Sequence, residues 1–512
     1  MIKPTENSAP PSGGAAGESS EDLAALAKGG RTNVFGFLLR LLARAPFLFI
    51  AGRLYGLEAV GRYASALILI ELVALMCSLG EKRGLAQRLT ESDEPQVNLV
   101  FDGLLAAFIL SLIAASILLI FPAPMFPNGM NSPLDFWLVL AIPAFAFTEI
   151  LLAAQAYKFD IATTVRARAI VEPWTLSIMA GVFFFIPATR DAGLTLAFIT
   201  SVYAATITAA WTFLRTYGLP KGWRPKPAYM WKMTARALPL IGADAVEWGT
   251  RRVDIFILGI VASPAAVAIY YMAQQIASLP QKLKTSFEPI LGPVITKNLK
   301  GNNLTAIAAH VRQVGFWIIA VQAGIALALG IPGEAIMGLI GPEYVQGSGA
   351  LAFLLAAEVA AAMAVVSESV LVYIARKRNF AISISIILLQ ASLTIGLIML
   401  ANHLGLSEPF KAAGAAMALL LALAISSLIK ALMLKKMLNA PVSNWRWALV
   451  WASAPAVVIG FLATMLPEWA EIVIGVPAIL ITYGWVIWHK GFGNDDRVLF
   501  RKNVGAEPAK ET

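Results

Sequence analysis

The chain has little of what a soluble globular protein needs. Only 14% of its 512 residues are charged, against roughly 25% in an ordinary soluble domain, while 58% are hydrophobic. A single cysteine, Cys77, excludes a framework of disulfides within the chain and a cysteine-rich metal site. The three histidines, His310, His403 and His489, are far apart in the sequence, which argues against a histidine-based zinc or catalytic cluster. We therefore expect no metal and no cofactor, and we predict a polytopic membrane protein.

The first thirty residues also lack an apolar core. They are rich in Pro, Gly, Ser and Ala, a composition typical of disordered segments. A cleaved signal peptide would place an apolar stretch directly after a basic start, and no such stretch follows here. We predict that residues 1–31 form a disordered cytoplasmic tail and that the first hydrophobic segment is a retained span.

Long apolar runs fill most of the remaining chain. A helix needs ~20 predominantly apolar residues to cross a bilayer, and turn-forming sequences separate most of the runs of that length. The sequence therefore predicts an all-α polytopic fold with fourteen transmembrane helices. Their centres lie near residues 43, 70, 108, 146, 176, 204, 248, 277, 320, 361, 390, 424, 455 and 480.

Lysine and arginine alternate between the connections of these helices. With the N-terminus inside, twenty-four fall in even-numbered connections and only four in odd-numbered ones, namely Arg53, Arg62, Arg190 and Lys411. Basic residues are retained on the cytoplasmic side. We therefore predict a multi-pass membrane protein with both termini cytoplasmic. This topology accounts for the net charge of +9 without nucleic acid as a partner.

Catalytic features are also missing. The external connections are short, the longest lying around residues 331–348, so no folded domain is available there to hold an active site. The sequence has no GxxxxGK[ST] nucleotide-binding loop. These absences favour a transporter over an enzyme. Two alternatives stay open: an ion-coupled small-molecule or drug exporter, whose cavity should be acidic, and a polytopic glycosyltransferase or polymerase, which would need a large external loop.

Two segments that lie six predicted helices apart are similar to each other. GRLYGLEAVGRYASA, from Gly52, and GIVASPAAVAIYYMA, from Gly259, share five identities in fifteen positions without a gap. Each links an odd-numbered to an even-numbered span, which indicates two parallel six-helix lobes, a recurrent transporter plan, followed by two further helices. The predicted division is an N-lobe at 32–217, a cytoplasmic linker at 218–235, a C-lobe at 236–438, helices thirteen and fourteen at 439–490 and a cytoplasmic tail at 491–512.

Three stretches carry a resemblance to a known family. They are GRLYGLEAVGRYASALILIELVALMCSLGEKRGLAQRL, RRVDIFILGIVASPAAVAIYYMAQQIASLP and GLIGPEYVQGSGALAFLLAAE. The chain resembles the Wzx-type O-antigen and polysaccharide flippases of the multidrug/oligosaccharidyl-lipid/polysaccharide exporter superfamily over roughly residues 33 to 440. It departs from the family pattern at Ala268, where a glycine is frequent.

That resemblance implies a function. The cargo would be an oligosaccharide on a polyprenyl diphosphate, moved by alternating access from the cytoplasmic to the periplasmic leaflet for surface polysaccharide biosynthesis. The expected partners are this lipid-linked oligosaccharide, the lipid bilayer and a polysaccharide polymerase machinery. The family also implies that helices one and seven line a central cleft.

The seventh predicted helix carries an unusual set of charges. LPLIGADAVEWGTRRVDIFILGIVASP, residues 238 to 264, contains five ionisable side chains. An unpaired charge at mid-bilayer costs about 2.5–3.5 kcal/mol on insertion scales, so such groups usually pair or face a watery cavity. Glu247, Arg251 and Asp254 lie at i, i+4 and i+7 on one helical stripe, which Asp244 extends. One interpretation is that Glu247, Arg251 and Asp254 neutralise one another inside the helix bundle.

Arg252 points about 100° away from this stripe and has no acid three or four positions away. Arg40 and Arg44, in the first span, are spaced i, i+4 and also lack a local carboxylate. The planar guanidinium fork suits a diphosphate because it binds two oxygens and stays charged. We predict that Arg44, Arg252, Arg40 and Arg251 face one another and bind the diphosphate. For Arg40, extension to the cytoplasmic surface is the alternative.

Other polar residues within predicted spans have less specific assignments. The intramembrane acids are candidates for H⁺ or Na⁺ coupling, or for pairing with the arginines: Asp244, Glu247, Asp254, Glu71, Glu358 and Glu368. Three residues are candidate hydrogen-bonding partners of sugar hydroxyls: Gln155, Tyr270 and Gln274.

Overall fold

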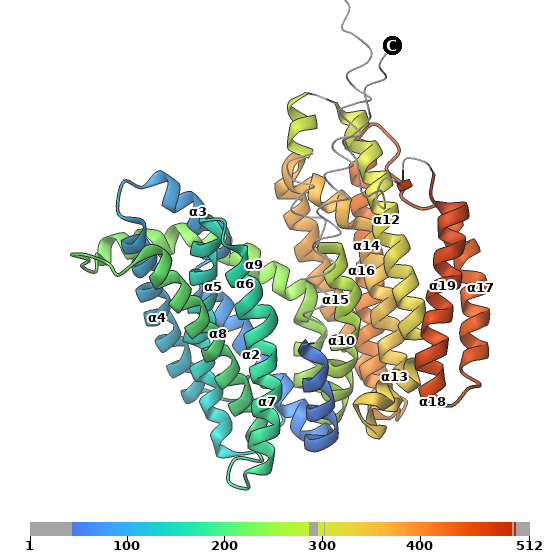
Figure 1. The fold of residues 1–512 in the computed structure, drawn as a ribbon, viewed down its shortest axis with the longest axis horizontal. Helices are drawn as coiled ribbons and strands as arrows, with labels where there is room; N and C mark the ends of the chain where they lie inside the picture. Colours follow the sequence, from blue (N-terminus) through green and yellow to red (C-terminus); the bar gives the residue numbers. More distant parts are fainter. Residues whose placement is uncertain (1–42, 286–294, 302, 494–495, 498–512) are drawn as a thin grey trace, which may run out of the picture.

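The computed structural model describes residues 43–285, 295–301, 303–493 and 496–497. Arg40, the tail at 1–31 and most of the tail at 491–512 lie outside the described residues. Within them the chain is helical and contains no strand (Figure 1). The elements are η1 Ala51–Tyr55, α2 Gly56–Cys77, α3 Glu81–Glu91, α4 Gln96–Ile120, η2 Pro133–Leu140, α5 Ala141–Tyr157, α6 Ile161–Val165, η3 Arg166–Val171, α7 Glu172–Phe185, α8 Gly193–Tyr217, α9 Pro227–Val261, α10 Pro264–Thr285, α12 Leu304–Gly330, α13 Gly333–Ile340, η4 Pro342–Gly347, α14 Ser348–Ile374, α15 Arg376–His403, α16 Glu408–Leu438, α17 Ala448–Ala463, α18 Glu468–Ala470, η5 Glu471–Gly475, α19 Val476–Val486 and η6 Ile487–Gly491.

Helix is present at each of the fourteen predicted positions, and ten helices in the described part are long and apolar enough to cross a membrane. The two numbers differ because the segment Ala43–Glu91 contains two predicted spans, α17 is shorter, and α9 and α10 are not among the ten. Helix α9 carries the five ionisable side chains noted above. The chain is an all-α polytopic membrane protein, and the number fourteen stays a prediction.

The helices form two bodies (Figure 1). Helices α2 to α8 make the first, which we call the N-lobe, and α10 to α19 make the second, which contains the C-lobe. The ribbons of the two bodies lie close together near α13 and diverge toward α3 and α12 (Figure 1). One apolar core runs from α2 and α5 into α10 and α14, and a second joins α12 and α14 to α17 and α19. The last two predicted spans therefore pack on the outer side of the C-lobe.

Backbone contacts join the two bodies where they lie close together. A Cβ atom at Gly61 would lie 1.8 Å from the carbonyl oxygen of Pro264, so α2 approaches the start of α10 more closely than any side chain allows. The Asn128 amide donates to the carbonyl oxygens of Gly259 at 3.0 Å and Ala262 at 3.1 Å. This end of the molecule is closed by tight packing and hydrogen bonds to backbone.

Helix α9 connects the bodies. It begins at Pro227, so the predicted linker at 218–235 is helical over its second half, consistent with the preference of proline for the first helical turn. Met233, near the start of α9, packs against Leu79 in the N-lobe, whereas Ile255, near its end, belongs to the core shared with α10. A single helix thus passes from one lobe to the other and places the charged stretch 244–254 between them.

Candidate functional site

Arg252 lies between the lobes and has partners from two other helices. Its Nη1 donates to Oε1 of Gln274 on α10 at 2.7 Å. Its Nη2 lies 3.9 Å from Oε2 of Glu71 on α2, and about a quarter of each of these two charged side chains is exposed, 26% and 25%. Gln274 is held in turn by a 3.3 Å hydrogen bond from its Nε2 to the carbonyl oxygen of Arg251. Arg252 has no acid three or four positions away on its own helix, as the sequence shows, and the carboxylate within 4 Å of its guanidinium comes from the opposite lobe.

Arg44 reaches the same face of the C-lobe from the first helix. Its Nη1 lies 3.5 Å from Oε1 of Gln275, the residue that follows Gln274 on α10. Tyr271, one turn earlier on α10, lies within electrostatic range of Arg44 and Arg252. Arg44 and Arg252 thus each contact one of two adjacent glutamines of α10, and their joint binding of a diphosphate stays a prediction. We call the group they form the arginine cluster: Arg44, Glu71, Arg252, Tyr271, Gln274 and Gln275.

The acids at the start of the charged stretch belong to a separate set of ion pairs. Arg83, on α3, contacts Asp244 through Nε at 2.6 Å and Glu247 through Nη2 at 2.5 Å. Arg251 lies 3.9 Å from Glu247. Arg83 is one of the basic residues counted above in the even-numbered connections. The sequence held one signal for an additional cation, since Arg251 lies four positions after Glu247 but seven after Asp244.

Asp254 has a different environment from the one predicted. It is fully buried, accepts a hydrogen bond from the hydroxyl of Tyr270 on α10, and accepts a 2.8 Å bond from the backbone N–H of Ile255. The predicted neutralisation of Arg251 by Asp254 is therefore wrong, because the carboxylate turns toward α10. Tyr270 is also fully buried, and its hydroxyl is engaged by Asp254.

The remaining candidates lie elsewhere. Glu368, on α14, pairs with Lys430 of α16 at 2.9 Å. Glu358, also on α14, is buried. Gln155, on α5, is buried, and neither polar atom of its side chain has a hydrogen-bond partner among the described residues. Within the same residues, Glu368 and Gln155 make no ion pair or hydrogen bond with the arginine cluster. Their roles stay predictions.

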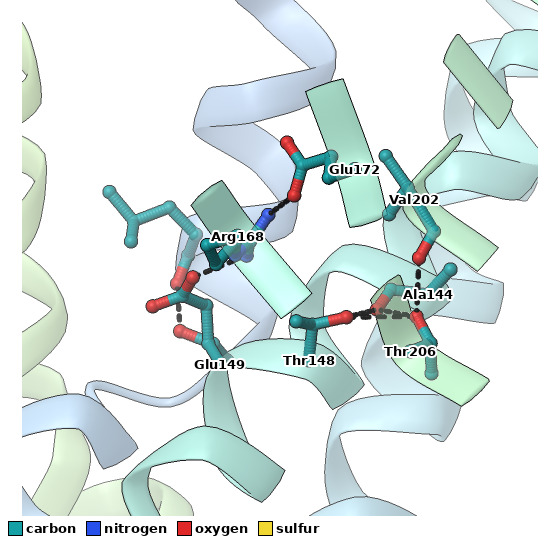
Figure 2. A network of polar contacts seen from close by, with 9 residues as sticks. Ala144, Thr148, Glu149, Arg168, Glu172, Val202 and Thr206 are labelled. Atoms are coloured by element: carbon teal, nitrogen blue, oxygen red, sulfur yellow. Dashed lines mark hydrogen bonds and ion pairs between the residues drawn. The ribbon is translucent and has the colours of Figure 1, made fainter. Parts of the chain in front are cut away.

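A second arginine network lies inside the N-lobe (Figure 2). Arg168, on η3, contacts Glu172 of α7 through Nη1 at 2.7 Å and Glu149 of α5 through Nη2. Its guanidinium carbon also lies 4.5 Å from the centre of the Phe145 ring. Each of the three charged side chains is at most 20% exposed. The sequence held one indication of this network, because Glu172 lies four positions after Arg168, a spacing that brings two side chains together on a helix. Arg168 is instead counted above among the basic residues of a cytoplasmic connection.

Comparisons with known proteins agree with this architecture. Residues 50–303 match a family model described as "Polysaccharide biosynthesis protein". The lipid II flippase MurJ in an inward closed conformation is 12% identical, with a TM-score of 0.66 over 89% of this chain and 97% of that one. An inward-facing multidrug resistance MATE family transporter of the MOP superfamily is 13% identical, with a TM-score of 0.60 over 81% and 98%. The Vibrio cholerae MATE transporter VcmN in its bent form is 14% identical, with a TM-score of 0.53 over 82% and 98%. No curated protein sequence matches the chain significantly.

Two helical bodies in a membrane, joined by one crossing helix, define a polytopic transporter fold. The likeness to these structures shows that the chain has the fold of the MOP superfamily transporters and flippases. Membership of that superfamily, which the sequence resemblance implied, is proposed below with the support of the family match. The narrower assignment to the Wzx type stays a prediction.

Proposed function

We propose that this protein is a flippase that moves a polyprenyl-diphosphate-linked oligosaccharide from the cytoplasmic to the periplasmic leaflet, for synthesis of a surface polysaccharide such as O-antigen, lipopolysaccharide or exopolysaccharide. The convergence of Arg44 and Arg252 on adjacent glutamines of α10 carries the proposal. The match of residues 50–303 to a polysaccharide biosynthesis family supports it.

The chemistry of the cluster suits a diphosphate. Arginine binds phosphate oxygens in pairs and keeps its charge at every physiological pH. Arg252 is partly exposed and its contact with Glu71 is long, so phosphate oxygens can replace this partner. Gln274 then holds the guanidinium in place while the ligand binds its free edge.

The shape of the molecule suits loading from one side. The lobes are in backbone contact at Gly61 and Pro264, the end that we predict to be external, and their ribbons diverge at the end that we predict to be cytoplasmic (Figure 1). In alternating access, two lobes rock about a site near the bilayer midplane. The conformation described here is then the one that receives cargo from the cytoplasm.

The same proposal covers location and partners. The protein lies in the bacterial inner membrane with both termini cytoplasmic, and it acts as a transporter rather than as an enzyme. It delivers its product to a polysaccharide polymerase machinery. The surrounding bilayer holds the lipid tail of the cargo throughout.

The alternative is an ion-coupled drug exporter of the same fold, which the likeness to MATE transporters favours. An exporter of organic cations binds through carboxylates. Asp244 and Glu247 are instead held by Arg83, and Glu71 lies beside Arg252. The arginines therefore favour an anionic cargo.

Flipping by purified protein tests the proposal. Proteoliposomes would contain a fluorescent polyprenyl-diphosphate oligosaccharide, and an impermeant quencher would report how much of it reaches the outer leaflet. We expect protein-dependent equilibration that empty liposomes and a monophosphate-linked analogue do not show. Equal rates with and without protein, together with export of a cationic dye, would favour the drug exporter.

Side-specific labelling tests the orientation. Single cysteines replacing Pro127 and Val345 should react with an impermeant thiol reagent in intact cells. Cysteines replacing Thr90, Pro225 and Lys377 should react only after permeabilisation, because basic residues hold these connections inside. Labelling at position 225 from outside would contradict the predicted topology.

A further inference from the structure

We propose that Glu71 is an internal competing anion, which restricts the arginine cluster to ligands with at least two negative charges and thereby selects a diphosphate over a monophosphate. This inference rests on the proposed function and deepens it. It assigns a role to a carboxylate that diphosphate binding by the arginines does not itself require.

The first observation is the length of the contact between Arg252 and Glu71. Their closest nitrogen and oxygen atoms are 3.9 Å apart, well beyond the roughly 2.7–2.9 Å of a charge-assisted hydrogen bond. By contrast, Arg168 contacts Glu172 at 2.7 Å. Glu71 therefore attracts Arg252 without saturating its donors, and a ligand with stronger acceptors can displace it.

The second observation is the charge balance of the cluster. Arg44, Arg252 and ionised Glu71 together carry one net positive charge. A monoanion that replaces Glu71 beside Arg252 brings the same single negative charge that Glu71 already supplies. It therefore gains little attraction to Arg252, and it leaves Glu71 without its partner. A diphosphate carries enough charge and enough oxygens to engage Arg252 and Arg44 at once, so it is attracted even while Glu71 stays ionised.

The third observation is an unused donor. Tyr63 lies eight residues before Glu71 on α2, which places both on the same side of the helix. Its hydroxyl is buried, and among the described residues it has no hydrogen-bond partner. It lies within electrostatic range of Glu71 and Arg44. Tyr63 is therefore a buried hydroxyl without a described partner on the same helix as Glu71.

The position of Glu71 also links binding to movement. Glu71 belongs to α2 of the N-lobe, whereas Arg252 is on the part of α9 that packs with the C-lobe. A ligand that takes Arg252 from Glu71 removes an attraction between the lobes. Binding energy specific to the dianion then biases the equilibrium between lobe arrangements, as differential affinity for two states requires.

Binding of two simple probes to the purified full chain tests the inference. Affinities for inorganic pyrophosphate and inorganic phosphate would be measured by calorimetry on wild type and Glu71→Gln, at a pH below the second pKa of phosphate so that this probe is a monoanion. Wild type should prefer pyrophosphate. Glu71→Gln should bind phosphate at least about tenfold more tightly than wild type, because a charge within about 4 Å of the ligand is removed, and the preference for pyrophosphate should shrink. Glu71→Asp, which keeps the charge, should retain the preference.

The controls separate this inference from the proposed function. Glu58→Gln removes a carboxylate from the same helix, where Glu58 pairs with Arg62 at 3.1 Å, and should leave both affinities unchanged. Arg252→Ala should lose pyrophosphate binding. Unchanged affinities in Glu71→Gln, alongside that loss, would overturn the inference and leave the proposed function standing. Full pyrophosphate binding by Arg252→Ala would overturn the proposed function itself.

Discussion

Arg168 and Arg252 both lie in helices, η3 and α9, and both have glutamate nearby, yet their surroundings differ. Arg168 contacts two carboxylates and stacks over an aromatic ring inside the N-lobe (Figure 2). Arg252 lies between the lobes, and its side chain is more exposed than that of Arg168. Its partners are the Glu71 carboxylate at 3.9 Å and the Gln274 side chain at 2.7 Å. An intramembrane arginine therefore indicates a ligand site only where its donors are incompletely used.

The largest effect that this comparison predicts is loss of folding in Arg168→Ala. Removing one partner of a buried ion pair typically costs about 3–5 kcal/mol, and here two carboxylates would lose their shared cation. We expect low membrane abundance and a lower unfolding temperature in detergent. Combining Arg168→Ala with Glu149→Gln and Glu172→Gln should restore part of both. Normal abundance of the single variant would show that the network is not structural.

The next prediction concerns transport. Arg252→Ala and Arg44→Ala should leave membrane abundance near normal and reduce polysaccharide export by about tenfold or more, since each tenfold loss corresponds to only about 1.4 kcal/mol. Lysine at either position should restore export in part, because it keeps the charge and loses the planar fork. Export would be measured by complementation and normalised to protein in the membrane. Normal export in both alanine variants would place the anion site elsewhere.

The sequence predicted the helices and the lack of a local acid beside Arg252, because both follow from spacing along one helix. It did not predict that Asp254 turns to Tyr270 or that Arg83 holds Asp244 and Glu247, because those partners come from other helices and depend on how the lobes pack. Local spacing shows that a charge lacks a partner on its own helix. Only tertiary packing shows which distant residue supplies it.

A smaller effect distinguishes two arginines next to the same acid. From spacing alone, Arg251→Ala should destabilise strongly, as a cation between two acids. Since Arg251 has only Glu247 at 3.9 Å and is one-third exposed, we expect less than about 1 kcal/mol. Arg83→Ala should lower the unfolding temperature more, because it leaves the largely buried Asp244 without its cation. Denaturation of both variants in the same detergent measures the difference, and the reverse order would contradict these assignments.

The last prediction involves an arginine outside the predicted spans, where a change of pH can remove the charge of its carboxylate partner. Arg446 contacts Asp496 at 2.6 Å, and the same carboxylate accepts hydrogen bonds from the Trp317 indole and the Gly493 N–H, both at 2.9 Å. Burial opposes ionisation of Asp496, but the bonds from Arg446, Gly493 and Trp317 outweigh it and hold the pKa below its usual value.

Because the pKa of Asp496 is lower in the folded than in the unfolded state, its ionised form stabilises the fold at pH values above the unfolded-state pKa of about 3.9. This stabilisation is lost as the pH falls through the folded-state pKa. Asp496→Asn should therefore unfold at lower temperature than wild type at pH 7, since hydrogen bonds to charged groups contribute about 1.5–3 kcal/mol. The difference should begin to shrink below about pH 4, near the unfolded-state pKa, and close as the pH falls through the lower folded-state pKa. Thermal unfolding of both proteins from pH 7 to pH 3 measures it. A difference that stays constant across this range would mean that the negative charge of Asp496 does not stabilise the fold. The ion pair between Arg446 and Asp496 would then add no ionic stabilisation.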